Sequence, residues 1–291
     1  MIGPDMGASR DDADTQRLEM LERWERAAAG WDRRAERVRE WGMPVSAWMI
    51  EQLSLQPGQT VLELAAGPGD TGFLAAELIR PGGRLLSSDA VEAMLEVARG
   101  RARQLGVDNV EFKQLELEWI DLETASVDAV LCRFGVMLSV DPGAALREMR
   151  RVLRPSGHVA LAVWDQPERN PWATIPTRAL VELGHAEPPD PEAPGMFVLS
   201  DRARLTGLLE EAGFLDVRIE AIEVDRVCAS VEEFVAETTD CSHVFASTFC
   251  SLGEADRAAV EAKIASLAAP FAGQDGSLRL PGSALGAAAE A

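Results

Sequence analysis

The chain contains no tyrosine among its 291 residues, and only 5% of them are aromatic. The absence of tyrosine excludes the Tyr–Lys catalytic pair of short-chain dehydrogenases. No run of about 18 apolar residues is present, as a membrane-spanning helix would require. The first 25 residues are polar and charged, without the apolar segment of a secretory signal. We therefore expect a cytoplasmic protein without a membrane span.

Basic residues are also scarce, with 28 Lys and Arg against 48 Asp and Glu and a formal net charge of −20. Binding to a phosphate backbone needs a basic surface, and no Lys/Arg stripe with interleaved aromatic residues occurs. The composition therefore argues against nucleic acid as a partner. The acidity favours solubility, and attraction of a cationic ligand is the functional alternative.

The four cysteines show no C-x-x-C spacing, so no disulfide framework is expected. Cys241, His243 and Cys250 are considered as a metal or soft-ligand site because they lie close together in the sequence. At helical spacing, however, these three residues would not share one face well. Buried structural thiols are the favoured interpretation, and no metal site is predicted.

Short apolar segments alternate with stretches of helical periodicity through the first half of the chain. The segments with strand character are residues 60–64, 84–88, 109–114, 127–132 and 157–164. This alternation predicts an α/β fold, namely a Rossmann-like, doubly wound and mostly parallel sheet with right-handed crossovers. Ligands in such sheets bind at the carboxyl ends of the strands, near the switch in strand order.

The other segments break this alternation. Residues 15–54 have a helical pattern with a break at Gly42-Met43-Pro44. Proline recurs through residues 166–200, which predicts an ordered lid. Strands near 215–224 and 277–287 bring the predicted sheet to seven. The predicted units are an N-terminal helical cap (1–45), the cofactor-binding core (46–165), the proline-rich insertion (166–200), a core helix and strand (201–225), a helical substrate lid (226–272) and the last strand with the tail (273–291).

A glycine loop follows the first predicted strand. Residues 61–72 read VLELAAGPGDTG, which contains G-x-G-x-x-G from Gly67 to Gly72. Glycines at 67 and 69 allow a ligand to approach the backbone. Asp89 ends the next strand, where a carboxylate can accept hydrogen bonds from both hydroxyls of a ribose. The loop therefore predicts a ligand that contains adenosine, and both NAD and S-adenosylmethionine meet this description.

Carboxylates beside the loop distinguish these two ligands. Glu63 lies within the strand, four positions before Gly67, where a dinucleotide fold usually keeps apolar residues. A carboxylate there suits a cationic ligand, or orders a loop that holds an ammonium group. Glu116 and Glu118 end the third strand, where either suits an adenine amino group. Together with the absence of tyrosine, these residues favour S-adenosylmethionine over a dinucleotide.

Five motifs occur in a fixed order: VLELAAGPG at 61–69, Asp89 with Met94-Leu95, Glu116-Leu117-Glu118, VLCRFGVM at 130–137 and LREMRRVLRPSG at 146–157. Over about residues 45–225 the chain resembles the class I S-adenosylmethionine-dependent methyltransferases. It is most similar to the group that includes the ubiquinone/menaquinone-biosynthesis methyltransferases. The resemblance implies an enzyme that uses S-adenosylmethionine and releases S-adenosylhomocysteine.

The resemblance also implies roles for individual residues. Those implied to surround the methionine portion are Glu63, the backbone of Ala65, Gly67 and Gly69, and Cys132 with Arg133. Those implied to surround the adenosine are Asp89, Ala90, Met94, Glu116, Leu117 and Glu118. Ala65 departs from the glycine that the family commonly has, which puts the closeness of the first turn in doubt. Structural alternatives are helix capping for Asp89, core packing for Met94 and an ion pair for Arg133. Glu116 and Glu118 could instead be solvated carboxylates of a loop.

Methyl transfer from a sulfonium needs a general base only when the nucleophile must lose a proton. His243 and His185 lie in the predicted lid segments and are the candidate bases, whereas His158 begins a strand and is interpreted as structural. Nucleobase and protein-glutamine methyltransferases share a [DN]-P-P-[YFW] segment after the fourth strand. Here that place reads CRFG from Cys132, which disfavours those substrates.

The cap segments carry apolar side chains that would suit an apolar pocket or ordinary helix packing. These are Trp24, Trp31, Trp41, Trp172, Met196, Phe197, Phe234, Phe245 and Phe249. The leading hypothesis is an O- or C-methyltransferase for a small, largely apolar metabolite, with aromatic or quinone-like compounds as candidates. The alternatives are an N-, S- or metalloid methyltransferase of the same fold, or a non-catalytic S-adenosylmethionine-binding module. Both a monomer and a homodimer are compatible with the sequence.

Overall fold

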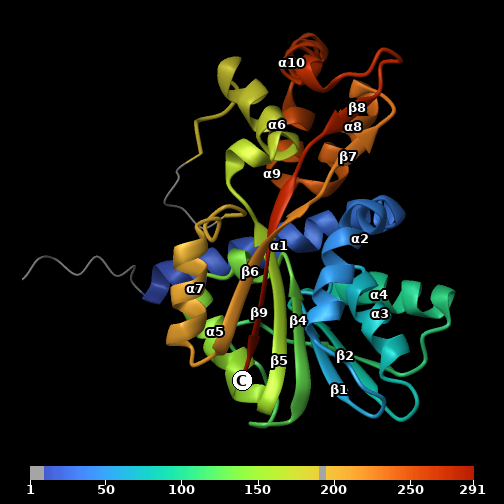
Figure 1. Ribbon diagram of the computed structural model, residues 1–291. Coiled ribbons are helices and arrows are strands. Elements are labelled where there is room, and N and C mark those ends of the chain that lie inside the picture. Colours follow the sequence, from blue (N-terminus) through green and yellow to red (C-terminus); the bar gives the residue numbers. More distant parts are fainter. Residues whose placement is uncertain (1–9, 190–194) are drawn as a thin grey trace, which may run out of the picture.

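The computed structural model describes residues 10–189 and 195–291, with side chains from residue 14 onward. Among these residues, seven strands form one twisted sheet in the order β3-β2-β1-β4-β5-β9-β6 (Figure 1). The strands are β1 (Thr60–Leu64), β2 (Arg84–Asp89), β3 (Val110–Gln114), β4 (Val127–Arg133), β5 (Leu153–Trp164), β6 (Leu215–Glu223) and β9 (Ser283–Glu290). Only β9 runs antiparallel to its neighbours in this sheet. The predicted doubly wound, mostly parallel α/β fold is confirmed.

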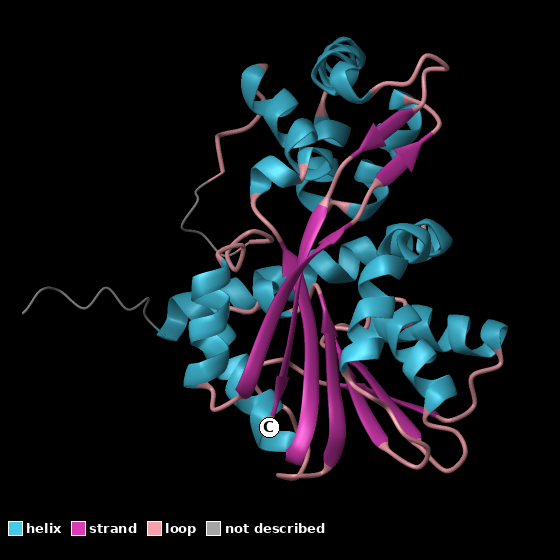
Figure 2. Ribbon diagram, viewed as in Figure 1, coloured by secondary structure: helices cyan, strands magenta, loops and turns pink. Residues whose placement is uncertain are grey.

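Helices cover both faces of the sheet (Figure 2). The helices of the core are α2 (Ala35–Gln52), α3 (Asp70–Leu78), α4 (Glu92–Leu105), α5 (Pro142–Val152) and α7 (Arg202–Glu211). Helices α2, α3 and α4 lie on one side of the sheet, and α5 and α7 lie on the other (Figure 1). From β1 the chain continues outward to β2 and β3, and from β4 it continues in the opposite direction to β5. The strand order therefore reverses between β1 and β4. This is the switch point at which parallel sheets bind ligands.

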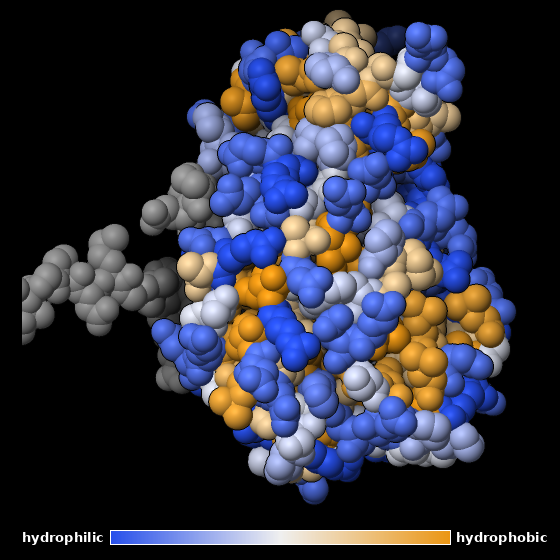
Figure 3. Space-filling view, in the orientation of Figure 1, coloured by the Kyte–Doolittle hydropathy of each residue, from blue (hydrophilic) through white to orange (hydrophobic). Residues whose placement is uncertain are grey.

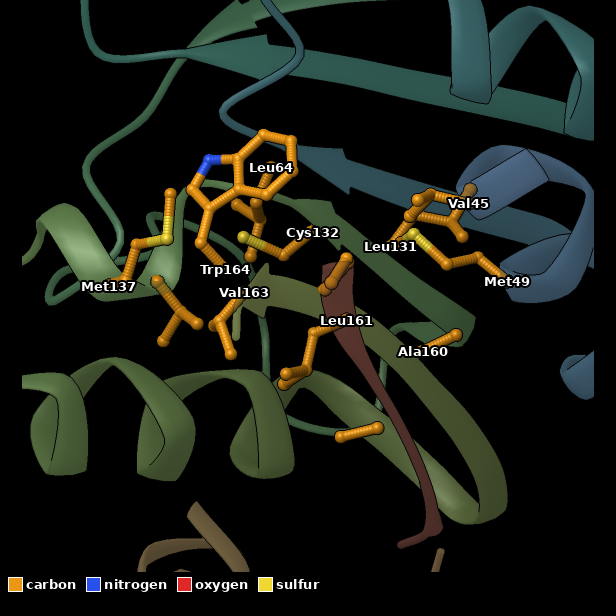
Figure 4. Close-up of a cluster of buried hydrophobic side chains, with 14 of the residues drawn as sticks. Val45, Met49, Leu64, Leu131, Cys132, Met137, Ala160, Leu161, Val163 and Trp164 are labelled. Carbon is orange, nitrogen blue, oxygen red and sulfur yellow. The ribbon is translucent and has the colours of Figure 1, made fainter. Parts of the chain in front are cut away.

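The central strands are apolar on both faces because helices cover both faces. Ala129, Val130, Leu131 and Cys132 of β4 are each at most 1% exposed. Figure 4 shows this core, in which Leu131 and Cys132 lie among side chains from α2, β1 and β5. The burial of β4 places the residues that follow it at the carboxyl edge of the sheet.

The expected break at Gly42-Met43-Pro44 is wrong, because α2 continues through all three residues. The chain breaks earlier, at Arg34, between α1 (Arg10–Arg33) and α2. Proline removes one backbone donor from a helix, but Val45 and Met49 just beyond it are fully buried. Their packing keeps the helix continuous and overrides the local signal.

A second lobe lies beyond the carboxyl ends of the strands (Figure 1). It comprises α6 (Pro171–Glu182), α8 (Val231–Cys241), α9 (His243–Ser251), α10 (Glu254–Ala268), and the antiparallel pair β7 (Arg226–Cys228) and β8 (Leu278–Leu280). The final predicted strand region thus contains β8 in this lobe and β9 in the sheet. Of the prolines that define the predicted insertion, Pro191 and Pro194 lie outside the described residues.

Helix α1 lies against both lobes, with contacts to α4 of the core and to α8 and α9 of the upper lobe. Hydrophilic residues are spread over both lobes on the face seen in Figure 3, in keeping with the net charge of −20. Within residues 10–189 and 195–291, no helix combines the length and the apolar character needed to cross a membrane.

Replacement of Leu131 by alanine tests the central position of β4. We expect Leu131→Ala to lower the free energy of unfolding by about 2–5 kcal/mol, because it leaves a cavity between packed layers. Leu215→Ala is the matched control, since Leu215 is 64% exposed, and it should change stability by less than about 0.5 kcal/mol. Urea unfolding followed by circular dichroism measures both. Equal effects of the two substitutions would contradict this account of the core.

Candidate active site

The glycine loop joins β1 to α3 through several residues in the left-handed backbone region. Ala65, Gly67 and Gly69 have φ values of 50°, 53° and 85°. Ala65 carries its Cβ in this region, where glycine is favoured. A Cβ on Gly135 would lie 2.5 Å from the Cβ of Ala65 and 2.8 Å from Sγ of Cys132. Because Gly135, after β4, has no side chain, the methyl group of Ala65 has room.

Glu63, in β1, holds the glycine loop through hydrogen bonds of its side chain. Its carboxyl accepts a 2.6 Å hydrogen bond from the N–H of Gly72 and a 2.9 Å bond from the hydroxyl of Ser87. The side chain is only 3% exposed. These contacts correspond to the expectation that a carboxylate here orders the loop. A direct contact of Glu63 with the methionine portion stays a prediction.

Burial raises the pKa of Glu63 to about 8, against the opposing effect of its hydrogen bonds to Gly72 and Ser87. Arg133 and Asp70 act on this carboxyl with opposite signs and smaller effect. Burial therefore favours the protonated form of this carboxyl over a wider pH range than for an exposed glutamate. A cationic group close to it would favour the ionised form.

Asp89 links the loop to the next helix. Its Oδ2 accepts a 2.9 Å bond from the N–H of Gly67, and its Oδ1 accepts a 3.1 Å bond from the N–H of Val91. Burial raises the pKa of Asp89, and the backbone bonds oppose this effect. Ala90 follows, with its carbonyl accepting a bond from the side chain of Gln114. Asp89 therefore supports the start of α4 and also lies directly beside the loop.

The structure distinguishes the two candidate carboxylates after β3. Glu118 accepts a 2.7 Å bond from Nε of Arg17 and a 2.8 Å bond from the N–H of Asp141. Glu116 is exposed, and its backbone forms an isolated bridge with Trp119. Glu118 thus has a structural role, which leaves Glu116 as the carboxylate available for a ligand. Leu117, between them, is partly buried against the core.

Met94 lies beneath helix α1. It is 2% exposed and forms a small buried cluster with Ala28 and Val91, against which Trp24 and Trp31 pack. Core packing accounts for Met94 in this arrangement. Its contact with an adenine stays a prediction.

Cys132 and Arg133 end β4 next to the glycine loop. Burial raises the pKa of the Cys132 thiol to about 12, while hydrogen bonds from the backbone of Val136 and Gly135 oppose the rise. Nη1 of Arg133 is buried and has no hydrogen-bond partner in the described part of the chain. A Cβ on Gly42 would lie 1.9 Å from this atom. Gly42 therefore makes room for the guanidinium, which explains a glycine inside α2.

Burial lowers the pKa of Arg133, with Asp70 and Glu63 acting in the opposite direction. Asp70 pairs with Arg101 at 2.7 Å rather than with Arg133. A structural ion pair was the alternative role considered for Arg133 from the sequence. Among residues 14–189 and 195–291, Arg133 forms no such pair. It places a guanidinium without a direct ion-pair partner among the described residues at the carboxyl edge of β4.

An aromatic cluster surrounds the carboxyl ends of β4 and β5. It consists of Trp41, Phe134, Trp164 and Trp172. The rings of Phe134 and Trp164 are stacked with centroids 4.0 Å apart, and Trp41 lies 6.3 Å from Phe134. Trp172 meets Trp164 edge-on at 4.7 Å. The sequence had indicated Trp41 and Trp172 but missed Phe134 and Trp164 as a pair. Phe134 and Trp164 each lie at the end of a predicted strand, and these two strands are neighbours. Their positions in the sequence could therefore have indicated that the two rings meet.

The other aromatic residues of the cap segments lie elsewhere. Trp24 and Trp31 pack with each other on α1, and Phe245 and Phe249 stack within the upper lobe. Met196, Phe197 and Phe234 also pack into the hydrophobic core. These residues are accounted for by helix packing.

The two candidate catalytic histidines lie in the upper lobe. His243 begins α9, and burial lowers its pKa, with smaller contributions from Arg26 and Arg23 of α1. His185 follows α6, where its N–H donates to the carbonyl of Leu180. His158 lies in β5 opposite Glu290, in keeping with a structural residue. Within the described residues, no group of His, Cys, Asp and Glu side chains is arranged to hold a metal ion.

The buried carboxyl of Glu63 makes stability depend on pH. Because folding raises its pKa from 4.5 to about 8, its stabilisation is complete below pH 4.5 and is lost as the pH rises towards 8. Glu63→Gln keeps a neutral acceptor for Gly72 at every pH. At pH 9 we expect the variant to be more stable than the wild type by on the order of 4 kcal/mol, with little difference at pH 4.5.

Urea unfolding at a series of pH values measures this difference. Glu77→Gln is the control, because the side chain of Glu77 is 81% exposed on the same helix that Glu63 supports. A difference between Glu63→Gln and the wild type that does not vary with pH would contradict the assignment.

Comparisons with known proteins agree with this geometry. The family model described as "Methyltransferase domain" matches residues 55–188. The ubiquinone/menaquinone biosynthesis C-methyltransferase of Hahella chejuensis is 31% identical over 175 residues, covering 56% of this chain and 70% of that protein. The protein of the same description from Klebsiella pneumoniae is 29% identical over 178 residues, covering 58% and 71%.

Solved structures show the same fold. The YcgJ protein of Bacillus subtilis matches with a TM-score of 0.56 and 18% identity, over 84% of this chain and 97% of that one. A putative methyltransferase of Bacillus halodurans matches with a TM-score of 0.55 and 19% identity over the same shares. The family is shown by the relative from Hahella chejuensis, of which this chain covers 70% at 31% identity. The chain belongs to the class I S-adenosylmethionine-dependent methyltransferases.

Proposed function

We propose that this methyltransferase transfers the methyl group to an oxygen or carbon atom of a small, largely apolar metabolite, with aromatic or quinone-like compounds as candidates. The aromatic cluster of Trp41, Phe134, Trp164 and Trp172 at the carboxyl ends of β4 and β5 is the observation that supports it. Trp164 and Trp172 are buried, whereas Trp41 and Phe134 are partly exposed and offer ring surface to a planar acceptor. The C-methyltransferases named above provide independent support for this class of acceptor.

The proposed cofactor site lies across the carboxyl ends of β1, β2 and β4. The methionine portion is assigned to the loop from Ala65 to Gly69, supported by Glu63 and bordered by Cys132 and Arg133. The ribose is assigned to Asp89 with Ala90, and the adenine to Glu116, Leu117 and Met94. Arg133 has an unpartnered nitrogen that suits the carboxylate of the methionine portion.

When bound, S-adenosylmethionine supplies an electrophilic methyl group on a sulfonium. The chain contributes mainly position, since alignment of two reactants in a dry site accounts for roughly 7–11 kcal/mol of a barrier. The loop and Asp89 would orient the cofactor, and the aromatic cluster would exclude water from the acceptor. Where the acceptor must lose a proton, His243 and His185 are the proposed bases.

The alternative acceptors receive no support from a specific contact. Cys241 and Cys250, considered for a soft or metalloid acceptor, lie on the different helices α8 and α9, and Cys250 is exposed. A cytoplasmic location and a monomeric or homodimeric state stay predictions.

An activity screen identifies the acceptor class. It measures the release of S-adenosylhomocysteine with a panel of phenols, quinols and amines, and mass analysis identifies the methylated product. Turnover with amines alone would contradict the proposal.

Calorimetric titration with S-adenosylhomocysteine tests the ribose assignment. We expect Asp89→Ala to weaken binding at least about tenfold, because hydrogen bonds to a charged group are worth roughly 1.5–3 kcal/mol. Asp89→Asn should bind with intermediate affinity, since its amide oxygen still accepts a bond. Circular dichroism verifies that the overall fold survives the substitution. Unchanged affinity in Asp89→Ala would contradict the assignment, and absence of binding by the wild type would contradict the whole site.

Glu116 and Glu118 form a matched pair for the adenine assignment. Glu116→Ala should weaken the binding of S-adenosylhomocysteine about tenfold without lowering stability, because its side chain is exposed. Glu118→Ala should lower the free energy of unfolding by about 1 kcal/mol, because it removes the contacts to Arg17 and Asp141. Calorimetry and urea unfolding measure the two effects. The opposite distribution would assign the adenine to Glu118.

A further inference from the structure

Arg226 lies between two tryptophans at the junction of the lobes. Its Cζ is 3.5 Å from the ring centroid of Trp172 and 4.2 Å from that of Trp41. Arg226 begins β7, whereas Trp172 belongs to α6 and Trp41 to α2. Three distant segments therefore combine to hold one guanidinium against the aromatic cluster.

Arg226 has no direct carboxylate partner within the described residues. Its Nε is buried without a hydrogen-bond partner, and no ion pair to Arg226 occurs in residues 14–189 or 195–291. The nearby Glu237 accepts a 2.7 Å bond from Nε of Arg37 instead. Burial lowers the pKa of Arg226 to about 10, with Cys241 and Glu237 opposing the shift. Stacking on tryptophan offsets part of the cost of this burial, but the Nε donor stays unsatisfied.

Arg133 is a second cation beside the aromatic cluster. Its Cζ lies 5.9 Å from the ring centroid of Phe134, and it too has a buried unpartnered nitrogen. Arg133 lies on the side of Glu63 and Asp70, next to the glycine loop. Arg226 lies on the side of the upper lobe. The two cations thus flank the aromatic rings, one towards the cofactor and one towards the lid.

An unpaired cation beside stacked aromatic rings suits a particular kind of ligand. A carboxylate or an ionised phenol would accept the free hydrogen bond of Arg226 and neutralise its charge. A planar ring carrying that oxygen would pack against the partly exposed rings of Trp41 and Phe134. The guanidinium provides this recognition better than an ammonium group, because its planar donors keep a fixed orientation between the two indoles.

We propose that Arg226 determines specificity for the methyl acceptor, and that it selects planar acceptors whose ring carries a carboxylate or an ionised hydroxyl group. This inference rests on the proposed function and narrows its acceptor class. It assigns recognition to Arg226 and leaves the cofactor carboxylate to Arg133. The competing explanation is that Arg226 only fastens the upper lobe to α2 and α6 through its contacts with Trp41 and Trp172.

Two probes with the same ring system separate these explanations. 2-Naphthoate carries an anionic oxygen, and 2-naphthylmethanol is its neutral counterpart. Their affinities are measured by calorimetry at pH 7.5, with and without saturating S-adenosylhomocysteine. The variants are Arg226→Met and Arg226→Lys. The control is Arg279→Met, because Arg279 lies on the paired strand β8, where it is exposed and bonded to Asp225.

We expect the wild type and Arg279→Met to bind 2-naphthoate at least about tenfold more tightly than 2-naphthylmethanol. Arg226→Met should lose this preference and keep its affinity for the neutral probe within about twofold. Arg226→Lys should retain part of the preference, since it keeps the charge without the planar donors.

Equal weakening of both probes in Arg226→Met would show a role in fastening the lobe and would overturn the proposal. A wild type that binds neither probe, or binds both equally, would overturn it as well. The binding of S-adenosylhomocysteine is measured separately for each variant. Its absence in the wild type would contradict the proposed function, while the titrations without cofactor would still decide the role of Arg226.

Discussion

The buried carboxyl of Glu63 is the contact on which the site depends. Through Gly72 and Ser87 it joins β1, α3 and β2 at the point where the strand order reverses. A Cβ on Gly72 would lie 2.2 Å from Oε2 of Glu63, so the last glycine of the loop is needed for the carboxyl rather than for a phosphate. The same G-x-G-x-x-G spacing that serves a pyrophosphate in dinucleotide folds here accommodates an internal acid. This explains why the spacing alone does not identify the ligand.

Small residues compensate for large ones around this contact. Ala65 occupies a glycine position in the loop, and Gly135 after β4 gives it room. Gly42 inside α2 gives room to the guanidinium of Arg133 in the same way. Each pair joins segments that are far apart in the sequence, so a change on one side requires a change on the other. The departure of Ala65 from the family pattern is therefore accommodated within the fold.

The parts of the fold with local signals could be predicted from the sequence. Alternating strand and helix patterns predicted the sheet and its switch point, because covered strands are apolar throughout. The continuity of α2 could not be predicted, because the burial of Val45 and Met49 outweighs the signal of Pro44. The distinction between Glu116 and Glu118 depends on Arg17, about a hundred residues away in the chain. Long-range pairing of this kind leaves no periodicity to read.

The connection between the lobes explains how the aromatic cluster is kept in place. Asn170 is fully buried, and its Oδ1 accepts 3.0 Å bonds from Nε1 of Trp172 and from the N–H of Ser283. Its amide group donates to the carbonyls of Asp165 and Ser283. One side chain therefore ties the end of β5, the start of β9 and the orientation of Trp172. Trp172 in turn lies against Arg226 at the start of β7. The first strand of the upper lobe is therefore linked to the central sheet through Trp172 and Asn170.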